Sequence, residues 1–107
     1  MNRLGVVGAI VLGIIMFAAA AHAEAPIATV TFKCADGKAI DATFYDGKVD
    51  LVLTDGRSLE LPQVISGSGT RYANADESFQ FYSKGDTAFI TENSDYNITF
   101  KDCTAIK

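Results

Sequence analysis

Two segments in the second half of the chain carry the side chains best suited to chemistry or to binding a partner. Residues 66–72 (SGSGTRY) form a Gly/Ser stretch that runs into an aromatic residue, and residues 81–88 (FYSKGDTA) are aromatic residues followed by a lysine and a glycine. Taken alone, each segment is typical of a solvated loop or turn. Together they supply the hydroxyl of Ser68 and the ammonium of Lys84, which are hydrogen-bond donors and which act as a nucleophilic pair in some enzymes.

Composition excludes chemistry that depends on histidine. The single histidine, His22, lies in the N-terminal segment, so residues 24–107 contain none. This removes Ser-His-Asp and Cys-His catalysis and any histidine-bound metal. A Ser–Lys enzyme would use Ser68 as nucleophile and Lys84 as base, but the local Ser-x-x-Lys spacing is absent. We therefore expect no enzymatic activity, no cofactor and no metal.

Residues 1–23 are typical of a secretory signal peptide. Arg3 gives a positive start, residues 4–21 are an uncharged run of 18, and the sequence Ala-His-Ala ending at Ala23 is a small-x-small cleavage site. We expect cleavage before Glu24. A retained anchor is the alternative, since 18 apolar residues are at the lower limit for spanning a bilayer. Because no cysteine follows the site, no lipid anchor is expected, and the predicted location is the periplasm, with secretion as the alternative.

The remaining 84 residues, 24–107, are enough for one domain only. They carry eight basic and 13 acidic residues, a net charge of −5. They contain no run of basic residues that would bind nucleic acid or an anionic membrane. An acidic surface suits a basic partner.

Cys34 and Cys103 are the only two cysteines, and they lie near opposite ends of this domain. In an exported protein such a pair predicts one disulfide. Closing a loop of this length stabilises a domain by roughly 4 kcal/mol in the chain-entropy model. No C-x-x-C motif is present, so the disulfide is expected to be structural and not a redox site.

Alternating apolar and polar residues predict a series of short antiparallel strands. Asp-Gly turns at residues 36–37, 46–47 and 55–56 recur every nine or ten residues, which is typical of a meander. Lys38 belongs to the first of these turns, and we expect its substitution to change binding little. The expected strands are residues 28–34, 40–44, 49–53, 59–61, 70–74, 78–83, 87–92 and 97–103.

Eight strands can close on themselves and remove both exposed edges. The predicted fold is therefore all-β, a small eight-stranded antiparallel β-barrel with one disulfide, in preference to an open sandwich. Phe32, Phe44, Leu51 and Phe79 are expected to fill its interior. If the interior were hollow instead, a lipocalin-like barrel that binds a small apolar ligand would be the alternative function.

The two segments singled out first resemble the signature motifs of a known family. The order Ser-Gly-x-x-Tyr, then aromatic-Ser-Lys-Gly-x-x-Ala, is similar to that in the bacterial inhibitors of C-type lysozyme. The resemblance covers nearly all of residues 24–107. It includes an early Cys-x-Asp-Gly at Cys34, a Leu-Pro at residues 61–62 before the Ser-Gly loop, and the late Cys103.

The resemblance implies an eight-stranded antiparallel barrel, a free periplasmic inhibitor, and a basic C-type lysozyme as partner. In the family, the loop serine and the lysine of the second motif enter the lysozyme cleft and contact its catalytic carboxylates, and these positions match Ser68 and Lys84. The lysozyme-binding residues expected on this basis are Ser68, Gly69, Tyr72, Tyr82, Lys84 and Gly85. The sequence leaves open which lysozymes are bound and whether the protein is a monomer or a homodimer.

Overall fold

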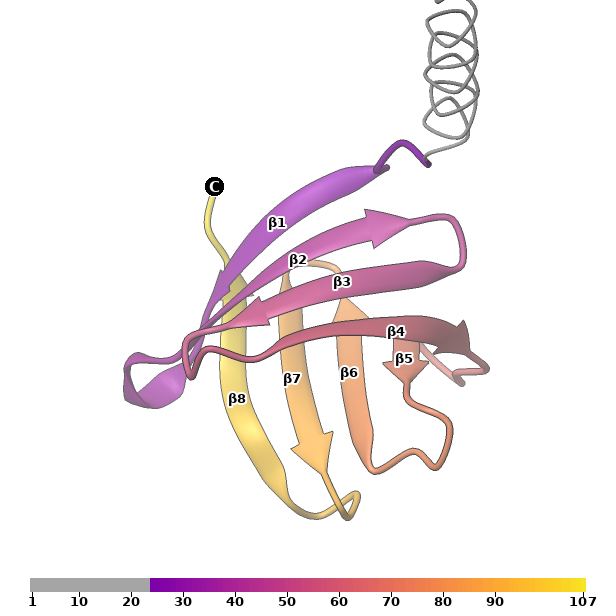
Figure 1. Ribbon diagram of the computed structural model, residues 1–107. Helices are drawn as coiled ribbons and strands as arrows, with labels where there is room; N and C mark the ends of the chain where they lie inside the picture. The colour runs from indigo at the N-terminus through magenta and orange to yellow at the C-terminus, as the bar shows by residue number, and fades with distance from the viewer. Residues whose placement is uncertain (1–23) are drawn as a thin grey trace, which may run out of the picture.

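The computed structural model describes residues 24–107, which form a closed barrel of eight antiparallel strands in sequence order (Figure 1). The expected signal peptide, residues 1–23, lies outside the described residues. The strands are β1 (Ala28–Lys33), β2 (Ala39–Tyr45), β3 (Lys48–Leu53), β4 (Ser58–Val64), β5 (Thr70–Ala73), β6 (Phe79–Lys84), β7 (Thr87–Glu92) and β8 (Ile98–Ala105). The predicted barrel is therefore confirmed. The described residues include no helix with the length and apolar character needed to cross a membrane.

The three predicted Asp-Gly turns join the first four strands. The second and third connect β2 to β3 and β3 to β4, and the first lies in a short 3-10 turn, η1 (Ala35–Gly37), which the sequence pattern did not predict. Gly56 shows why glycine follows the aspartate, because its φ of +95° lies in the region that side chains disfavour.

Inward-facing side chains fill the barrel. Phe81 is fully buried, and its ring centroid lies 6.1 Å from that of Phe32 and 6.2 Å from that of Phe44. Of the predicted core residues, Phe32, Leu51 and Phe79 are buried, and Phe44 is partly buried against the core. The alternation of apolar and polar residues therefore identified the packed interior correctly.

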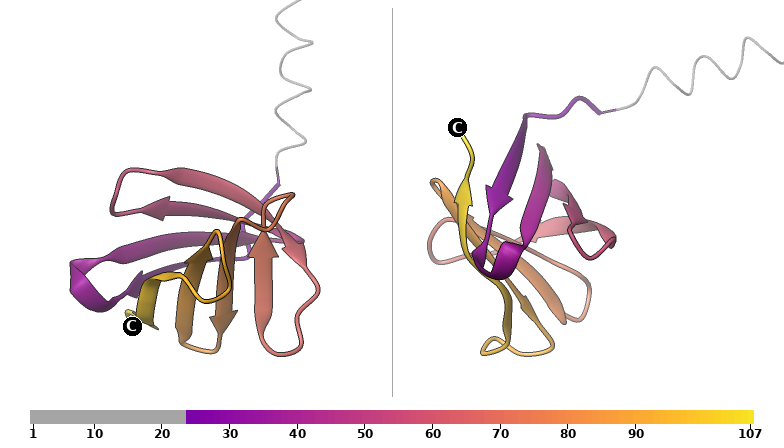
Figure 2. Two further views of the ribbon diagram at one scale, coloured as in Figure 1. Left: turned by 90° about the horizontal axis from the view of Figure 1, so that it is seen from below. Right: turned by 90° about the vertical axis from the view of Figure 1, so that its left-hand side faces the viewer.

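The barrel consists of two four-stranded halves, β1–β4 and β5–β8, whose strands run across each other (Figures 1 and 2). Two short ladders join them. The β1–β8 ladder has the pairs Phe32–Ala105 and Lys33–Thr104, and the β4–β5 ladder has Gln63–Tyr72 and Val64–Arg71.

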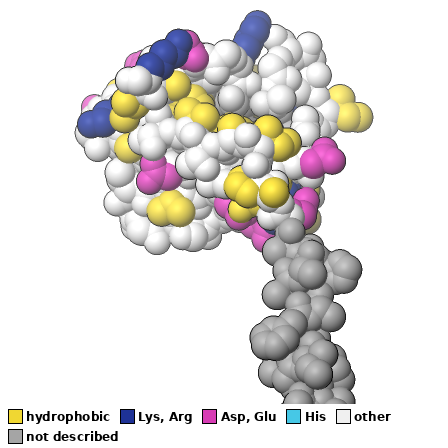
Figure 3. Space-filling view, turned by 90° about the horizontal axis from the view of Figure 1, so that it is seen from above, with side chains coloured by type: hydrophobic (Ala, Val, Ile, Leu, Met, Phe, Trp, Pro, Cys, Tyr) yellow, Lys and Arg dark blue, Asp and Glu magenta, His cyan; other side chains and the backbone are white. Residues whose placement is uncertain are grey.

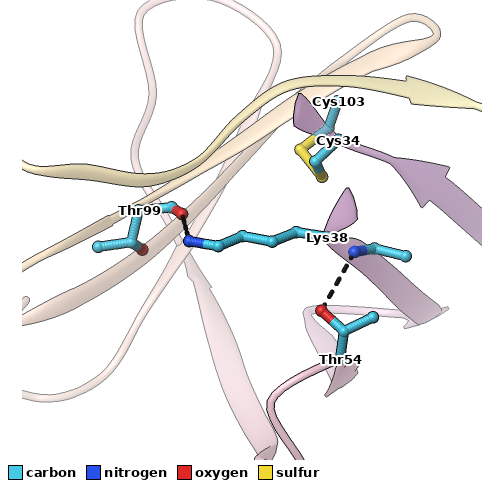
Figure 4. Close-up of a disulfide and its surroundings, with 6 residues drawn as sticks. Cys34, Lys38, Thr54, Thr99 and Cys103 are labelled. Carbon is cyan, nitrogen blue, oxygen red and sulfur yellow. Dashed lines mark hydrogen bonds between the residues drawn. A yellow bond between two sulfur atoms is a disulfide. The ribbon is translucent and has the colours of Figure 1, made fainter. Parts of the chain in front are cut away.

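The predicted disulfide between Cys34 and Cys103 is present and lies beside the β1–β8 ladder (Figure 4). Cys34 directly follows β1, and Cys103 belongs to β8. The cross-link thus ties the first strand to the last where few backbone pairs hold them together.

Lys38 links the first Asp-Gly turn to β8. Its ammonium donates a hydrogen bond of 2.6 Å to the carbonyl of Thr99 (Figure 4). The same ammonium lies 5.0 Å from the centre of the Phe100 ring. It therefore braces η1 against β8, a long-range contact that local turn chemistry does not reveal.

A bidentate ion pair also joins the two halves of the barrel. The guanidinium of Arg57, in the β3–β4 turn, donates bonds of 2.7 and 3.0 Å to the carboxylate of Glu92 at the end of β7. Arg57 also bonds Asp55 at 2.9 Å. The hydrogen bonds from Arg57 hold the pKa of Glu92 below its ordinary value. This pair links a hairpin of one half of the barrel to a strand of the other.

Candidate partner-binding site

A surface cleft of about 250 Å³ brings the two candidate segments together. It is lined by Ser68, Tyr82, Ser83, Lys84, Thr87, Ala88 and Phe89. Three of the expected binding residues, Ser68, Tyr82 and Lys84, therefore share one cleft, although the serine and the lysine are 16 positions apart in the sequence.

Gly69 explains how the β4–β5 loop (residues 65–69) reaches β6. Its φ is +68°, and a Cβ atom there would lie 2.6 Å from the carbonyl oxygen of Ser83 and 3.0 Å from Cβ of Lys84. The next residue, Thr70, donates a hydrogen bond of 3.2 Å to the same carbonyl. Only a residue without a side chain fits this contact, which holds Ser68 beside Lys84.

Lys84 is the last residue of β6, and its side chain is exposed. Its carbonyl accepts a 2.9 Å bond from the Thr87 hydroxyl, which closes the turn through Gly85 into β7. The nearby Asp86 carboxylate pairs with Lys107. Among residues 24–107 no carboxylate forms an ion pair with Lys84, so its ammonium is available to a partner.

Ser68 is exposed near the tip of the β4–β5 loop. Its carbonyl accepts a 2.8 Å hydrogen bond from the Ser66 hydroxyl, which braces the loop internally. Its own hydroxyl has no hydrogen-bond partner in the described part of the chain. The cleft thus presents one hydroxyl and one ammonium, which suits a pair of carboxylates.

An aromatic pair forms one wall of the cleft. The rings of Tyr82 and Phe89, which face each other across β6 and β7, stack with centroids 4.5 Å apart and an interplanar angle of 11°. Phe89 was not among the predicted site residues. The sequence carries no signal for it, because Ala88, Phe89 and Ile90 are all apolar. In the structure its two neighbours are buried, and alternation along the strand places Phe89 on the outer face.

Tyr72 takes a different place from the other expected binding residues. Its side chain is only 5% exposed and lies inside the barrel, with its ring centroid 6.0 Å from that of Phe44 and 6.1 Å from that of Phe81. It supports β5 from the core and presents almost no surface to a partner.

The side chains that line the cleft include no histidine, cysteine or carboxylate that could bind a metal ion. In the described ranges, no group of three or more His, Cys, Asp or Glu side chains is arranged to hold a metal ion. The groups that line the cleft are neutral or cationic donors and aromatic rings. The arrangement is therefore suited to an anionic surface of a partner.

Comparison with known proteins identifies the family of the chain. The sequence model of a family described as membrane-bound lysozyme-inhibitor of c-type lysozyme matches residues 32–98, more than half of the chain, including both segments of the site. A protein of Yersinia enterocolitica named "Membrane-bound lysozyme inhibitor of C-type lysozyme" is 46% identical over 56 residues, which are 52% of this chain and 44% of that protein. The match thus spans less than half the length of this relative. No solved structure matches the chain. The chain belongs to the family of membrane-bound inhibitors of C-type lysozyme.

Proposed function

We propose that this protein inhibits C-type lysozyme by placing Lys84 and Ser68 at the catalytic carboxylates of the enzyme. Family membership and the name of the Yersinia relative support lysozyme as the partner. The observation that carries the proposal is the shared cleft. In it an exposed serine of the β4–β5 loop and an exposed lysine at the end of β6 lie side by side, and the donor groups of both have no partner among residues 24–107.

The chemistry of the two partners is complementary. A retaining lysozyme holds two carboxyl groups about 5 Å apart, one as acid and one as nucleophile or stabiliser. Lys84 offers a compact ammonium with three donors, and Ser68 offers a hydroxyl that donates to the second carboxylate. The absence of a side chain at Gly69 keeps the β4–β5 loop narrow and close to β6, as entry into a cleft requires.

The charge of the protein favours binding of a basic enzyme both at long range and in direct contact. The net charge of −5 over residues 24–107 attracts a basic enzyme at long range. Figure 3 shows acidic side chains at several places on one face, some of them next to basic side chains, with hydrophobic side chains across the middle of that face. At short range the cleft itself presents a lysine, so the acidic protein offers a cation where the basic enzyme has its carboxylates.

We also propose that residues 1–23 are removed and that residues 24–107 act as a free domain in the periplasm. The leader sequence and the absence of a cysteine after Ala23 support this. Intact-mass measurement of the protein from periplasmic extract should show the loss of 23 residues. A full-length species in the membrane fraction would contradict the proposed location.

A lipocalin-like role receives no support from the barrel interior. The side chains of Phe32, Phe81 and Phe100 are each no more than 2% exposed and pack where an apolar ligand would have to bind. The interior of this barrel is thus one of those that side chains fill, and not one that holds a ligand. We therefore propose no second function.

Inhibition is tested by the lysis of bacterial cells by a C-type lysozyme, followed as the loss of turbidity. The protein should slow lysis in proportion to its concentration, up to a molar excess over the enzyme. An acidic protein of similar size and charge serves as control for non-specific association with a basic enzyme. Unchanged lysis at a large excess of the protein would refute the proposal.

A further inference from the structure

The two short ladders of the barrel are held in different ways. The β1–β8 ladder lies beside the Cys34–Cys103 disulfide. The β4–β5 ladder also has two residue pairs. Both cysteines of the described residues form the disulfide at the other ladder, so no covalent link crosses this one. The β4–β5 loop, which carries Ser68, leaves the barrel at this second seam. Some other interaction must therefore hold the loop in place.

The side chain of Arg71 spans this seam. Its Nε and Nη2 atoms donate hydrogen bonds of 3.0 and 2.8 Å to the carbonyl of Ile65, the first residue of the loop. Its Nη1 atom donates to Glu77 at 2.9 Å and to Gln80 at 2.7 Å. The planar guanidinium satisfies these acceptors at once, which a lysine could not do. One side chain thus connects the loop to β5, to the β5–β6 turn and to β6.

Gln80 extends the same cluster to the cleft and to the next loop. It is 4% exposed, and its side-chain oxygen also accepts a 2.9 Å bond from the hydroxyl of Tyr82. Its amide nitrogen donates a 2.7 Å bond to Asp95 in the β7–β8 connection. Because Gln80 itself is buried, a displacement of its side chain would leave a buried amide without hydrogen-bond partners, so these contacts hold it in place.

We infer that Arg71 is a positioning residue that orders the β4–β5 loop for lysozyme binding without contacting the enzyme's carboxylates. The inference rests on the function proposed above. The loop is fixed at both ends, at Ile65 by Arg71 and at Gly69 by its contact with Ser83. A loop that is ordered before it binds loses less conformational entropy in the complex, so its affinity is higher.

The test compares two arginines that each make bidentate contacts. Arg71→Met removes all donors at the seam and keeps an apolar stem of similar length. Arg57→Met is the matched control, because it removes the ion pair with Glu92 at the β3–β4 turn and leaves the loop contacts in place. Amide hydrogen exchange in residues 65–70 and affinity for a purified C-type lysozyme are measured at a temperature where circular dichroism shows every variant folded.

Arg71→Met should speed exchange in residues 65–70 and weaken lysozyme binding by about tenfold to a hundredfold, as expected for hydrogen bonds from a charged donor. Arg57→Met should change neither the hydrogen exchange of residues 65–70 nor the affinity for lysozyme, although both variants should lower the melting temperature. If Arg71→Met does not fold, Arg71→Lys is used instead. It keeps the positive charge but lacks the planar guanidinium with its several donors, and it should weaken lysozyme binding less than Arg71→Met would.

The outcomes distinguish this inference from the proposed function. Parent-like affinity of the folded Arg71 variants, or an equal loss in Arg57→Met, overturns the positioning role and leaves lysozyme inhibition intact. A parent protein that does not bind lysozyme overturns the proposed function and this inference with it.

Discussion

Gly69 and Ser83 approach each other so closely that a Cβ atom on the glycine would lie 2.6 Å from the serine carbonyl oxygen. This contact joins two segments that are separate in the sequence and brings Ser68 beside Lys84. Real Cβ atoms do not come so near to a backbone oxygen, so any side chain at this position must push the loop away from β6.

Gly69→Ala should therefore damage both stability and inhibition. The left-handed backbone at φ +68° disfavours alanine by about 1 kcal/mol, and the clash with Ser83 adds to this. We expect a lower melting temperature and inhibition weakened by at least about tenfold, since about 1.4 kcal/mol corresponds to a factor of ten. Inhibition constants and thermal unfolding by circular dichroism measure the two effects.

Gly56→Ala is the matched control for this prediction. Gly56 has φ +95°, but nothing lies within 4 Å of the point where a Cβ atom would sit, so only the backbone strain applies. The variant should lose stability and inhibit as well as the parent. An equal loss of inhibition in both variants would show that general destabilisation, and not the contact with Ser83, is responsible.

Replacing both Cys34 and Cys103 by serine should lower stability without removing inhibition. The chain-entropy model gives a loss of roughly 4 kcal/mol for a loop of this length. The disulfide lies at the β1–β8 seam, whereas the proposed inhibitory loop leaves the β4–β5 seam. Urea unfolding and inhibition at low temperature test the two parts, and a folded double variant without inhibition would contradict this separation.

Stability should fall in acid partly through Glu92. Because Arg57 lowers the pKa of Glu92 in the folded protein, the ion pair stabilises the fold above the ordinary glutamate pKa of about 4.3 and this contribution is lost as the pH falls through the lower folded value. Glu92→Gln should lower the free energy of unfolding at pH 7 by roughly 1–2 kcal/mol and should flatten its decline in acid.

Urea unfolding at a series of pH values from about 7 to about 3 measures this dependence. Glu60→Gln is the control, because Glu60 forms an exposed ion pair with Lys48 that should contribute little. A parent and a Glu92→Gln variant with parallel pH curves would rule out the ion pair as the source of the acid sensitivity.

The fold could be predicted from the sequence because its signals are local. Alternation from Ala28 to Cys34 and the Asp-Gly turns each depend on a few consecutive residues, and the structure has strands and turns at these places. The fourth strand was predicted too short, because β4 continues through Pro62 to Val64. The disulfide was predictable because Cys34 and Cys103 had no other partners.

The candidate site and the surroundings of Lys38 were predicted less completely, because they depend on the register of neighbouring strands and on contacts between segments that are distant in the sequence. Phe89 belongs to the cleft because the register of β6 and β7 places it opposite Tyr82, and Lys38 is engaged because η1 lies against β8. The inward direction of Tyr72 was not evident either, since its strand reads Thr-Arg-Tyr-Ala and lacks a clear alternation of apolar and polar residues.

Ser68→Ala should weaken inhibition moderately. The serine hydroxyl is expected to donate one hydrogen bond to a charged carboxylate, which is worth about 1–2 kcal/mol. Since the loop is braced by the Ser66 hydroxyl and the carbonyl of Ser68, the substitution should leave the loop conformation unchanged. The inhibition constant measures the effect, and a loss larger than that of the Lys84 substitution would reverse the proposed order of importance.

The inhibition constant of Lys84→Ala is the most direct test of the proposed mechanism. Lys33→Ala is the control with the same change of charge, because Lys33 is exposed on β1 and, within residues 24–107, belongs to no ion pair. Lys84→Ala should weaken inhibition by about 2–5 kcal/mol, since it leaves desolvated carboxylates without a cation, and Lys33→Ala should change it little. A folded Lys84→Ala variant that inhibits lysozyme as strongly as the parent would contradict the mechanism.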